Sequence, residues 1–239
     1  MLPIQRAREI VRVLFKTIER LTQNPRPALP NPAFNTLAAA VIAGPILFQS
    51  LSGALQLAWL GYNPVRDAVS LLVFGPFGWL QTIAFSLFAC SLVALAVMLY
   101  FHVKSPFKPG LVVLLMLGAA FAVVAANPTG LPGVKDTITA LTHRGASIFI
   151  VTAFPAACFL VAPTLKARHH ATLRSFTIGM GVFALLFLTI GGLVLVNRFS
   201  LVGLYERVLL AGGQLWVEFV CAQMLWDRLR SAQSHISQT

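Results

Sequence analysis

Residues 77–101 read FGWLQTIAFSLFACSLVALAVMLYF and carry no charged side chain. A helix needs about 20 residues to cross about 30 Å of hydrocarbon, because each residue advances it by about 1.5 Å. This stretch therefore predicts a transmembrane helix. Five other stretches share its apolar character and approximate length, namely residues 36–59, 110–126, 145–165, 175–196 and 203–226. The sequence thus predicts an all-α fold, a polytopic membrane bundle of six transmembrane helices.

The overall composition agrees with this fold class. Hydrophobic residues make up 57% of the 239-residue chain and charged residues only 10%, which leaves too little polar surface for a soluble globule. The net charge of +11 comes from short basic blocks between the apolar stretches, which predicts anionic lipid headgroups as partners and no nucleic acid. Cys90, Cys158 and Cys221 all lie inside apolar stretches, so neither disulfide bonds nor a metal site is predicted. No cofactor motif occurs.

A basic amphipathic helix is predicted ahead of the first span. Apolar residues recur at spacings of three and four over residues 4–21, and five Arg and Lys residues occupy other positions. We interpret this segment as a helix in the cytoplasmic headgroup plane, with packing on the cytosolic ends of the bundle as the alternative. Four prolines in residues 24–32 predict a linker. The predicted domains are the cytoplasmic helix and linker (1–32), the transmembrane domain (33–228) and a cytoplasmic tail (229–239).

The orientation follows from the distribution of Lys and Arg. With the N-terminus inside, thirteen of the 18 basic residues lie on the cytoplasmic side and five on the other side. This bias matches the positive-inside rule. Six spans also require both termini on one side. The sequence therefore predicts a multi-pass protein of the cytoplasmic membrane with both termini in the cytoplasm.

The predicted extracytoplasmic face holds a cluster of interleaved charges and polar side chains. Its members are Asp67, Ser70, Asn127, His143, Arg144, Glu206 and Arg207. One interpretation is a ligand site. The other is a clasp between helix ends, with Asp67 pairing with Arg207 and Arg144 with Glu206, and the sequence favours the clasp. His143 has no second ligand at a metal-binding spacing, so a metal site is not predicted.

A polar stripe runs inward from this cluster along the last span. Arg207, Gln214 and Glu218 stand at spacings of seven and four, which places them on one side of a helix. A carboxylate inside a span is costly unless it faces the bundle interior. Glu218 is therefore interpreted as a proton or ion site, or as part of an interhelical hydrogen bond, and the hydrogen bond is favoured.

Several short motifs resemble one known family. They are YNPVRDAVS at residues 62–70, Gly78-Trp79, Asn127-Pro128-Thr129, His143, and GLYER at residues 203–207. Together they resemble the prokaryotic six-helix membrane family known as domain of unknown function 998, over roughly residues 36–226. The most specific elements are P-x-x-D-x-x-S and G-L-x-E-R. Gly130 and Ser147 depart from the pattern, at positions where the resemblance implies an acid and a second histidine. The resemblance implies a prokaryotic inner membrane and no particular activity.

Three classes of function are compatible with these observations. A non-enzymatic membrane component that binds lipid or a membrane-protein partner ranks first, because no catalytic motif is present. A small transporter or proton-coupled sensor using the polar stripe ranks second. A lipid-modifying enzyme at the outer leaflet, with Asp67, Glu206 or His143 as acid or base, ranks third. No nucleophile with an adjacent base can be named, so no catalytic residue is predicted.

Overall fold

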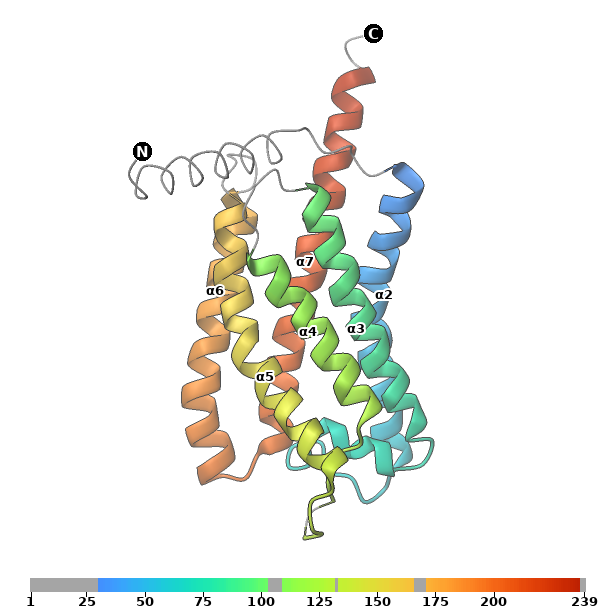
Figure 1. Ribbon diagram of the computed structural model, residues 1–239, viewed down its shortest axis with the longest axis vertical. Helices are drawn as coiled ribbons and strands as arrows, with labels where there is room; N and C mark the ends of the chain where they lie inside the picture. Colours follow the sequence, from blue (N-terminus) through green and yellow to red (C-terminus); the bar gives the residue numbers. More distant parts are fainter. Residues whose placement is uncertain (1–29, 103–108, 132, 166–170, 237–239) are drawn as a thin grey trace, which may run out of the picture.

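The computed structural model describes residues 30–102, 109–131, 133–165 and 171–236 (Figure 1). Six helices in these ranges are long and apolar enough to cross a membrane, which confirms the prediction of six spans. The main helices are α2 (Asn31–Ala58), α3 (Trp79–His102), α4 (Pro109–Ala126), α5 (Ile138–Val161), α6 (Ala171–Leu186) and α7 (Val202–Ile236). Two 3₁₀ helices, η1 (Val69–Phe74) and η2 (Ala162–Thr164), and the π-helix η4 (Phe187–Arg198) complete the fold. The amphipathic helix predicted over residues 4–21 lies outside the described residues.

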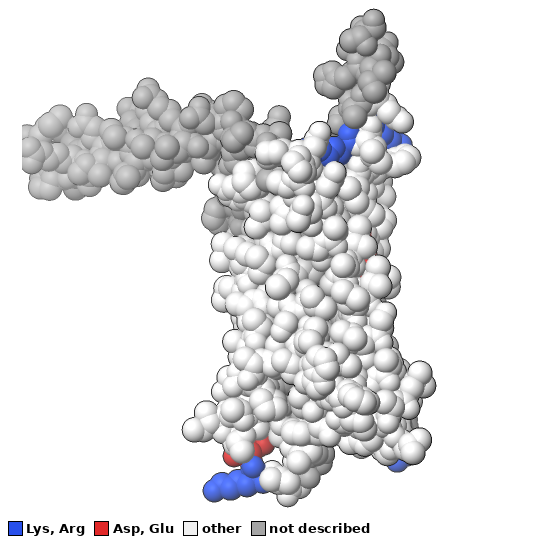
Figure 2. Space-filling model, turned by 90° about the vertical axis from the view of Figure 1, so that its right-hand side faces the viewer, with Lys and Arg blue, Asp and Glu red and all other residues white. Residues whose placement is uncertain are grey.

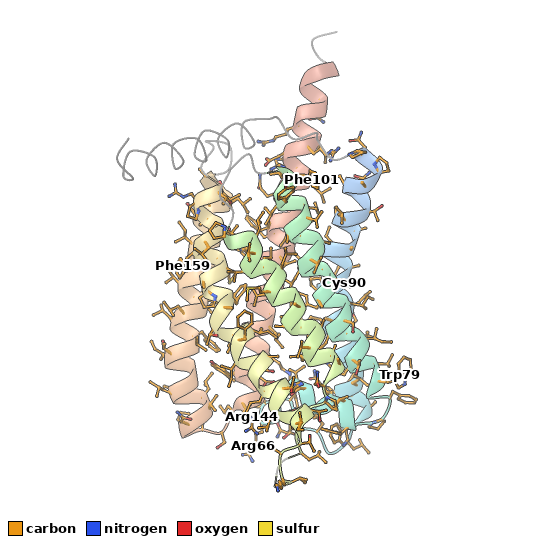
Figure 3. All side chains as sticks on the ribbon, in the orientation of Figure 1. Arg66, Trp79, Cys90, Phe101, Arg144 and Phe159 are labelled. Atoms are coloured by element: carbon orange, nitrogen blue, oxygen red, sulfur yellow. The ribbon has the colours of Figure 1, made fainter. Side chains whose placement is uncertain are left out.

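The helices stand side by side and alternate in direction (Figure 1). Each of α2 to α6 packs against the next helix in the chain, and α7 packs against α2, α3 and α6. We call the end that carries the connections 59–78, 127–137 and 199–201 the lower end of the bundle, as drawn in Figure 1. Figure 3 places Arg66 and Arg144 at this end, with Trp79 at its edge and Phe101 near the opposite end.

The surface between the two ends is almost free of charge. Figure 2 shows a broad belt that is white except for one small acidic patch at its edge, with basic side chains near the upper end and both acidic and basic side chains at the lower end. Large apolar side chains such as Leu57, Leu115 and Leu193 are exposed on this belt. Helices satisfy their own backbone hydrogen bonds, so a belt of this kind suits contact with lipid.

Several helix boundaries differ from the prediction. Helix α2 begins at Asn31, within the predicted linker, because Pro32 lies in the first turn where no backbone donor is needed. Helix α5 begins at Ile138 rather than near residue 145, because the Thr137 hydroxyl caps it by accepting the Ala140 N–H at 3.1 Å. His143 therefore lies inside a helix. At the other end of the chain, α7 continues to Ile236, past the predicted end at residue 226.

An aromatic cluster joins α2, α3 and α4. The ring of Phe48 lies 5.4 Å from Phe85 and 5.9 Å from Phe88, and Phe88 meets Phe121 edge to face at 4.8 Å. Offset and edge-to-face pairs of this kind are favourable beyond the area they bury. The cluster fixes one wall of the interior space described below.

Candidate functional site

The connection between α2 and η1 forms a turn organised by its own polar side chains. The Asn63 side-chain oxygen accepts the N–H groups of Val65 at 3.0 Å and Arg66 at 3.3 Å. The Asp67 carboxylate accepts the Asn63 N–H at 2.7 Å. Asn and Asp commonly stabilise turns by such bonds to nearby backbone. The carboxylate of Asp67 therefore has a local role and does not pair with Arg207 as predicted.

The first turn of α7 docks on this connection. The N–H of Gly203 donates to the Arg66 carbonyl at 3.3 Å, and the N–H of Leu204 donates to the Val65 carbonyl at 2.9 Å. The first N–H groups of a helix lack partners within the helix, so these carbonyls satisfy them. Gly203 is buried, and a β-carbon there would lie only 2.3 Å from the Asp67 carbonyl oxygen. The approach thus requires glycine.

Arg207 completes this contact through carbonyl and phenol oxygens. Its Nη1 donates to the carbonyl oxygens of Asp67 at 3.2 Å and Gly203 at 3.0 Å, and its Nη2 donates to the Tyr62 hydroxyl at 2.5 Å. The Tyr62 hydroxyl in turn donates to the carbonyls of Asp67 and Ala68. Burial raises the pKa of the Tyr62 phenol above its ordinary value, although the Arg207 hydrogen bond acts in the opposite direction. We call these contacts between residues 62–69 and 203–207 the interlock.

Glu206 binds the same connection on the adjacent side of α7. Its carboxylate accepts the N–H of Val69, the first residue of η1, at 2.8 Å. The predicted pairing of Glu206 with Arg144 is wrong, because Arg144 pairs with Asp136 at 2.9 Å on the exposed surface. The contacts between α7 and the turn before η1 therefore consist of bonds to backbone groups and to the Tyr62 hydroxyl rather than of the two predicted ion pairs.

Asn127 and His143 form a second polar contact at the lower end. Nδ1 of His143 lies 2.7 Å from the Asn127 carbonyl oxygen, and the Asn127 side chain donates to the Val123 carbonyl at 2.9 Å near the end of α4. His143 is buried at 5% exposure. The end of α4 therefore holds the imidazole in a fixed orientation, which is a positioning role for Asn127.

A cavity opens inside the bundle above these contacts. It lies between η1, α3, α4, α5 and α7, and the unfilled space there amounts to about 830 Å³ when the open solvent at its mouth is included. Its polar lining comes from Ser70, His143, Ser147 and Glu206, while Phe88, Phe121 and other apolar side chains line the rest. A second cavity of about 660 Å³ shares Ser70, Phe85, Val124 and His143 with the first. The two cavities therefore meet at Ser70 and His143.

These motifs and their geometry point to one family. A family model described as "Protein of unknown function (DUF998)" matches residues 26–223. The chain belongs to the DUF998 family. The resemblance based on P-x-x-D-x-x-S and G-L-x-E-R is thereby confirmed, and in this DUF998 member the two motifs are the two halves of the interlock. No curated protein and no solved structure matches the chain.

The polar stripe predicted along α7 does not continue the cavity of this DUF998 protein. On α7 the cavity is lined by Glu206, Leu210 and Gly213. Arg207 and Gln214 directly follow Glu206 and Gly213 in the sequence, so they lie on a different side of the helix. Gln214 is buried and accepts a hydrogen bond from Gln49 of α2 at 2.5 Å, which is an interhelical contact. Glu218 is partly buried on α7 and, like Gln214, is not among the described residues that line either cavity.

The structure divides the predicted cluster into three parts. The cavity is lined by Ser70, His143 and Glu206, with the Asn127 carbonyl holding His143. The interlock contains Asp67 and Arg207 and also Glu206, whereas Arg144 lies on the surface. The prediction missed Ser147 as a lining residue, although its place one turn after His143 was a signal. It also missed Tyr62 and Gly213. Among the described residues, no group of three or more His, Cys, Asp or Glu side chains could hold a metal ion.

Proposed function

We propose that this DUF998 protein is a non-enzymatic component of the prokaryotic cytoplasmic membrane that binds a lipid-like molecule in the interior cavity. The observation that supports this proposal is the division of the cavity lining. Polar side chains gather at the lower end, and aromatic and aliphatic side chains line the remainder. A mostly apolar lining with a few convergent polar groups is typical of small-molecule sites.

The polar end of the cavity is held in place before any ligand arrives. The Val69 N–H fixes the Glu206 carboxylate, and the Asn127 carbonyl fixes the His143 ring. Preorganised groups of this kind lower the entropic cost of binding. The hydrogen bonds of the described residues do not link Ser70 to His143, so these contacts support binding in preference to nucleophilic catalysis.

Filling the cavity from its wall is expected to abolish ligand binding. A β-carbon at Gly213 would meet only Phe154, at 3.7 Å, so Gly213→Ala fits, whereas the larger side chain of Gly213→Leu must enter the cavity. A leucine side chain in the cavity occupies space that the ligand needs, and a loss of about 1.4 kcal/mol or more of binding free energy corresponds to at least about a tenfold loss of binding. Native mass spectrometry of the protein extracted in mild detergent measures the fraction that retains a bound lipid.

The matched control for this experiment is Gly179→Leu. Gly179 is exposed on α6, and a β-carbon there meets nothing within 4 Å. We expect the Gly179→Leu and Gly213→Ala variants to retain the lipid at the wild-type level. Equal lipid retention by Gly213→Leu and Gly179→Leu would reject the cavity as the binding site.

We further propose that the lower end faces away from the cytoplasm, as the bias of thirteen against five basic residues predicts. In a cysteine-free background, a cysteine at the exposed position Arg66 should react with an impermeant maleimide in intact cells. A cysteine at the exposed position Arg230 should react only after the membrane is opened. The reverse labelling pattern would show that the lower end faces the cytoplasm and would contradict this proposal. Binding of anionic headgroups by residues 4–21, or of a membrane-protein partner, stays a prediction.

A further inference from the structure

We infer that the bound molecule is a lipid alcohol, an apolar body with an uncharged hydroxyl group, selected by the His143 imidazole and the Glu206 carboxylate. This inference rests on the proposed function and adds the chemistry of the ligand's polar group. It follows from which atoms at the polar end of the cavity can donate a hydrogen bond and which can only accept one.

The contact of His143 with Asn127 fixes the proton on the imidazole. Nδ1 lies 2.7 Å from a carbonyl oxygen, which can only accept, so Nδ1 must carry the hydrogen. In the neutral ring, Nε2 is then an acceptor. A second proton would place a positive charge beside walls that are mostly apolar, which is costly. His143 therefore presents a hydrogen-bond acceptor to the cavity, and the ligand must donate a hydrogen bond to it.

Glu206 and Ser70 fit the same requirement. One carboxylate oxygen of Glu206 accepts the Val69 N–H. Glu206 also lines the cavity, so its second carboxylate oxygen is available to accept a hydrogen bond from a ligand. The Ser70 hydroxyl lines both cavities and can either donate or accept. A ligand hydroxyl can donate to an acceptor and accept from Ser70 at once. An ammonium group can only donate, so it cannot accept a hydrogen bond from Ser70 as a hydroxyl can.

A phosphate headgroup lacks a partner in the cavity. No Lys or Arg occurs among the described residues that line the two cavities. The guanidinium of Arg207, the residue after Glu206, is bound to Tyr62 and to the carbonyls of Asp67 and Gly203. Phosphate groups in proteins are usually held by Arg or Lys, and here the acid Glu206 would repel one. The lining therefore favours an uncharged polar group.

Photocrosslinking tests this inference on the full-length protein in nanodiscs. The probe is a long-chain alcohol with a diazirine in its chain, and peptide mass spectrometry locates the adducts. The competitors are the unlabelled alcohol, amine and phosphate monoester of the same chain length. We expect adducts on cavity residues such as Phe88 and Leu210, and we expect the phosphate to require at least about tenfold more than the alcohol to compete.

The outcomes separate the two proposals. The absence of adducts in the cavity would overturn the proposed function itself. Adducts in the cavity, with the amine or the phosphate competing as well as the alcohol, would overturn only the lipid alcohol. The Glu206→Gln variant keeps an oxygen acceptor for the Val69 N–H but removes the charge. In this variant, the ratio between the phosphate and alcohol concentrations needed to compete with the probe should fall. An unchanged ratio in a folded variant would also overturn the inference.

Discussion

The Gly203→Ala variant is expected to open the lower end of the bundle. A β-carbon at this position would lie 2.3 Å from the Asp67 carbonyl oxygen, 2.6 Å from the Pro64 carbonyl oxygen and 2.9 Å from Nη1 of Arg207. The two carbonyl oxygens belong to the backbone of a turn that its own side chains hold in place, so moving them has a substantial cost in free energy. The start of α7 must move away and lose its bonds to Val65 and Arg66.

The expected loss of stability is at least about 3 kcal/mol, the upper end of the usual cost of overpacking. Thermal unfolding in detergent, followed by tryptophan fluorescence, measures this loss. Gly53→Ala is the matched control, because a β-carbon on this glycine of α2 meets nothing within 4 Å. Alanine favours a helix over glycine by up to about 1 kcal/mol, so the control should melt at or above the wild-type temperature. Equal melting of the two variants would contradict the interlock.

Removing the Arg207 guanidinium is expected to have the second largest effect. The Arg207→Met variant loses charged hydrogen bonds to Tyr62, Asp67 and Gly203, and such bonds contribute about 1.5–3 kcal/mol each when net solvation is included. We expect a net loss of about 3 kcal/mol in the free energy of unfolding, less than the sum of three such bonds, because bonds made by one guanidinium are not independent. Arg207→Lys should recover less than half of it, because a single ammonium cannot reach in both directions as a planar guanidinium does.

The control for this experiment is Arg144→Met. Arg144 is also charged and lies at the same end, but its pair with Asp136 is exposed, with 59% of the Arg144 side chain accessible. Exposed ion pairs contribute about 0–1 kcal/mol, so this variant should melt close to the wild type. A double variant in which Asp67 and Arg207 are exchanged should not recover the stability that the Arg207 variants lose, because Arg207 binds the Asp67 carbonyl and not its carboxylate. Recovery by the exchanged pair would contradict the observed geometry.

Much of the fold could be predicted because hydrocarbon imposes a simple length requirement. The predicted span at residues 110–126 differs from α4 by one residue at its start. The bounds could be predicted this closely because a basic or proline-rich segment bounds the apolar stretch. The start of α5 was predicted too late. The polar residues His143 and Arg144 precede the apolar stretch that begins at residue 145, yet the Thr137 cap begins the helix before them. Local capping outweighed hydropathy there.

The site residues could be predicted but their partners could not. Polar residues at the ends of apolar stretches are visible in a sequence, and Ser70, His143 and Glu206 were found in this way. The atoms that bind Arg207 and Glu206 are largely backbone carbonyl and N–H groups, which every residue carries and no sequence pattern marks. The cavity depends on which helices are neighbours, so Gly213 could not be distinguished from other small residues of the last span.

The interlock also has a consequence for biosynthesis. The Val69 N–H and the Glu206 carboxylate are 137 residues apart in the chain. At about 5–20 residues per second, the ribosome needs about 7–27 s to make the intervening segment. During that interval the turn at residues 62–69 has been synthesised, while its partner on α7 has not been made. The lower end can close only after α7 has been made, so the compartment inside the protein cannot be complete before this helix joins the bundle.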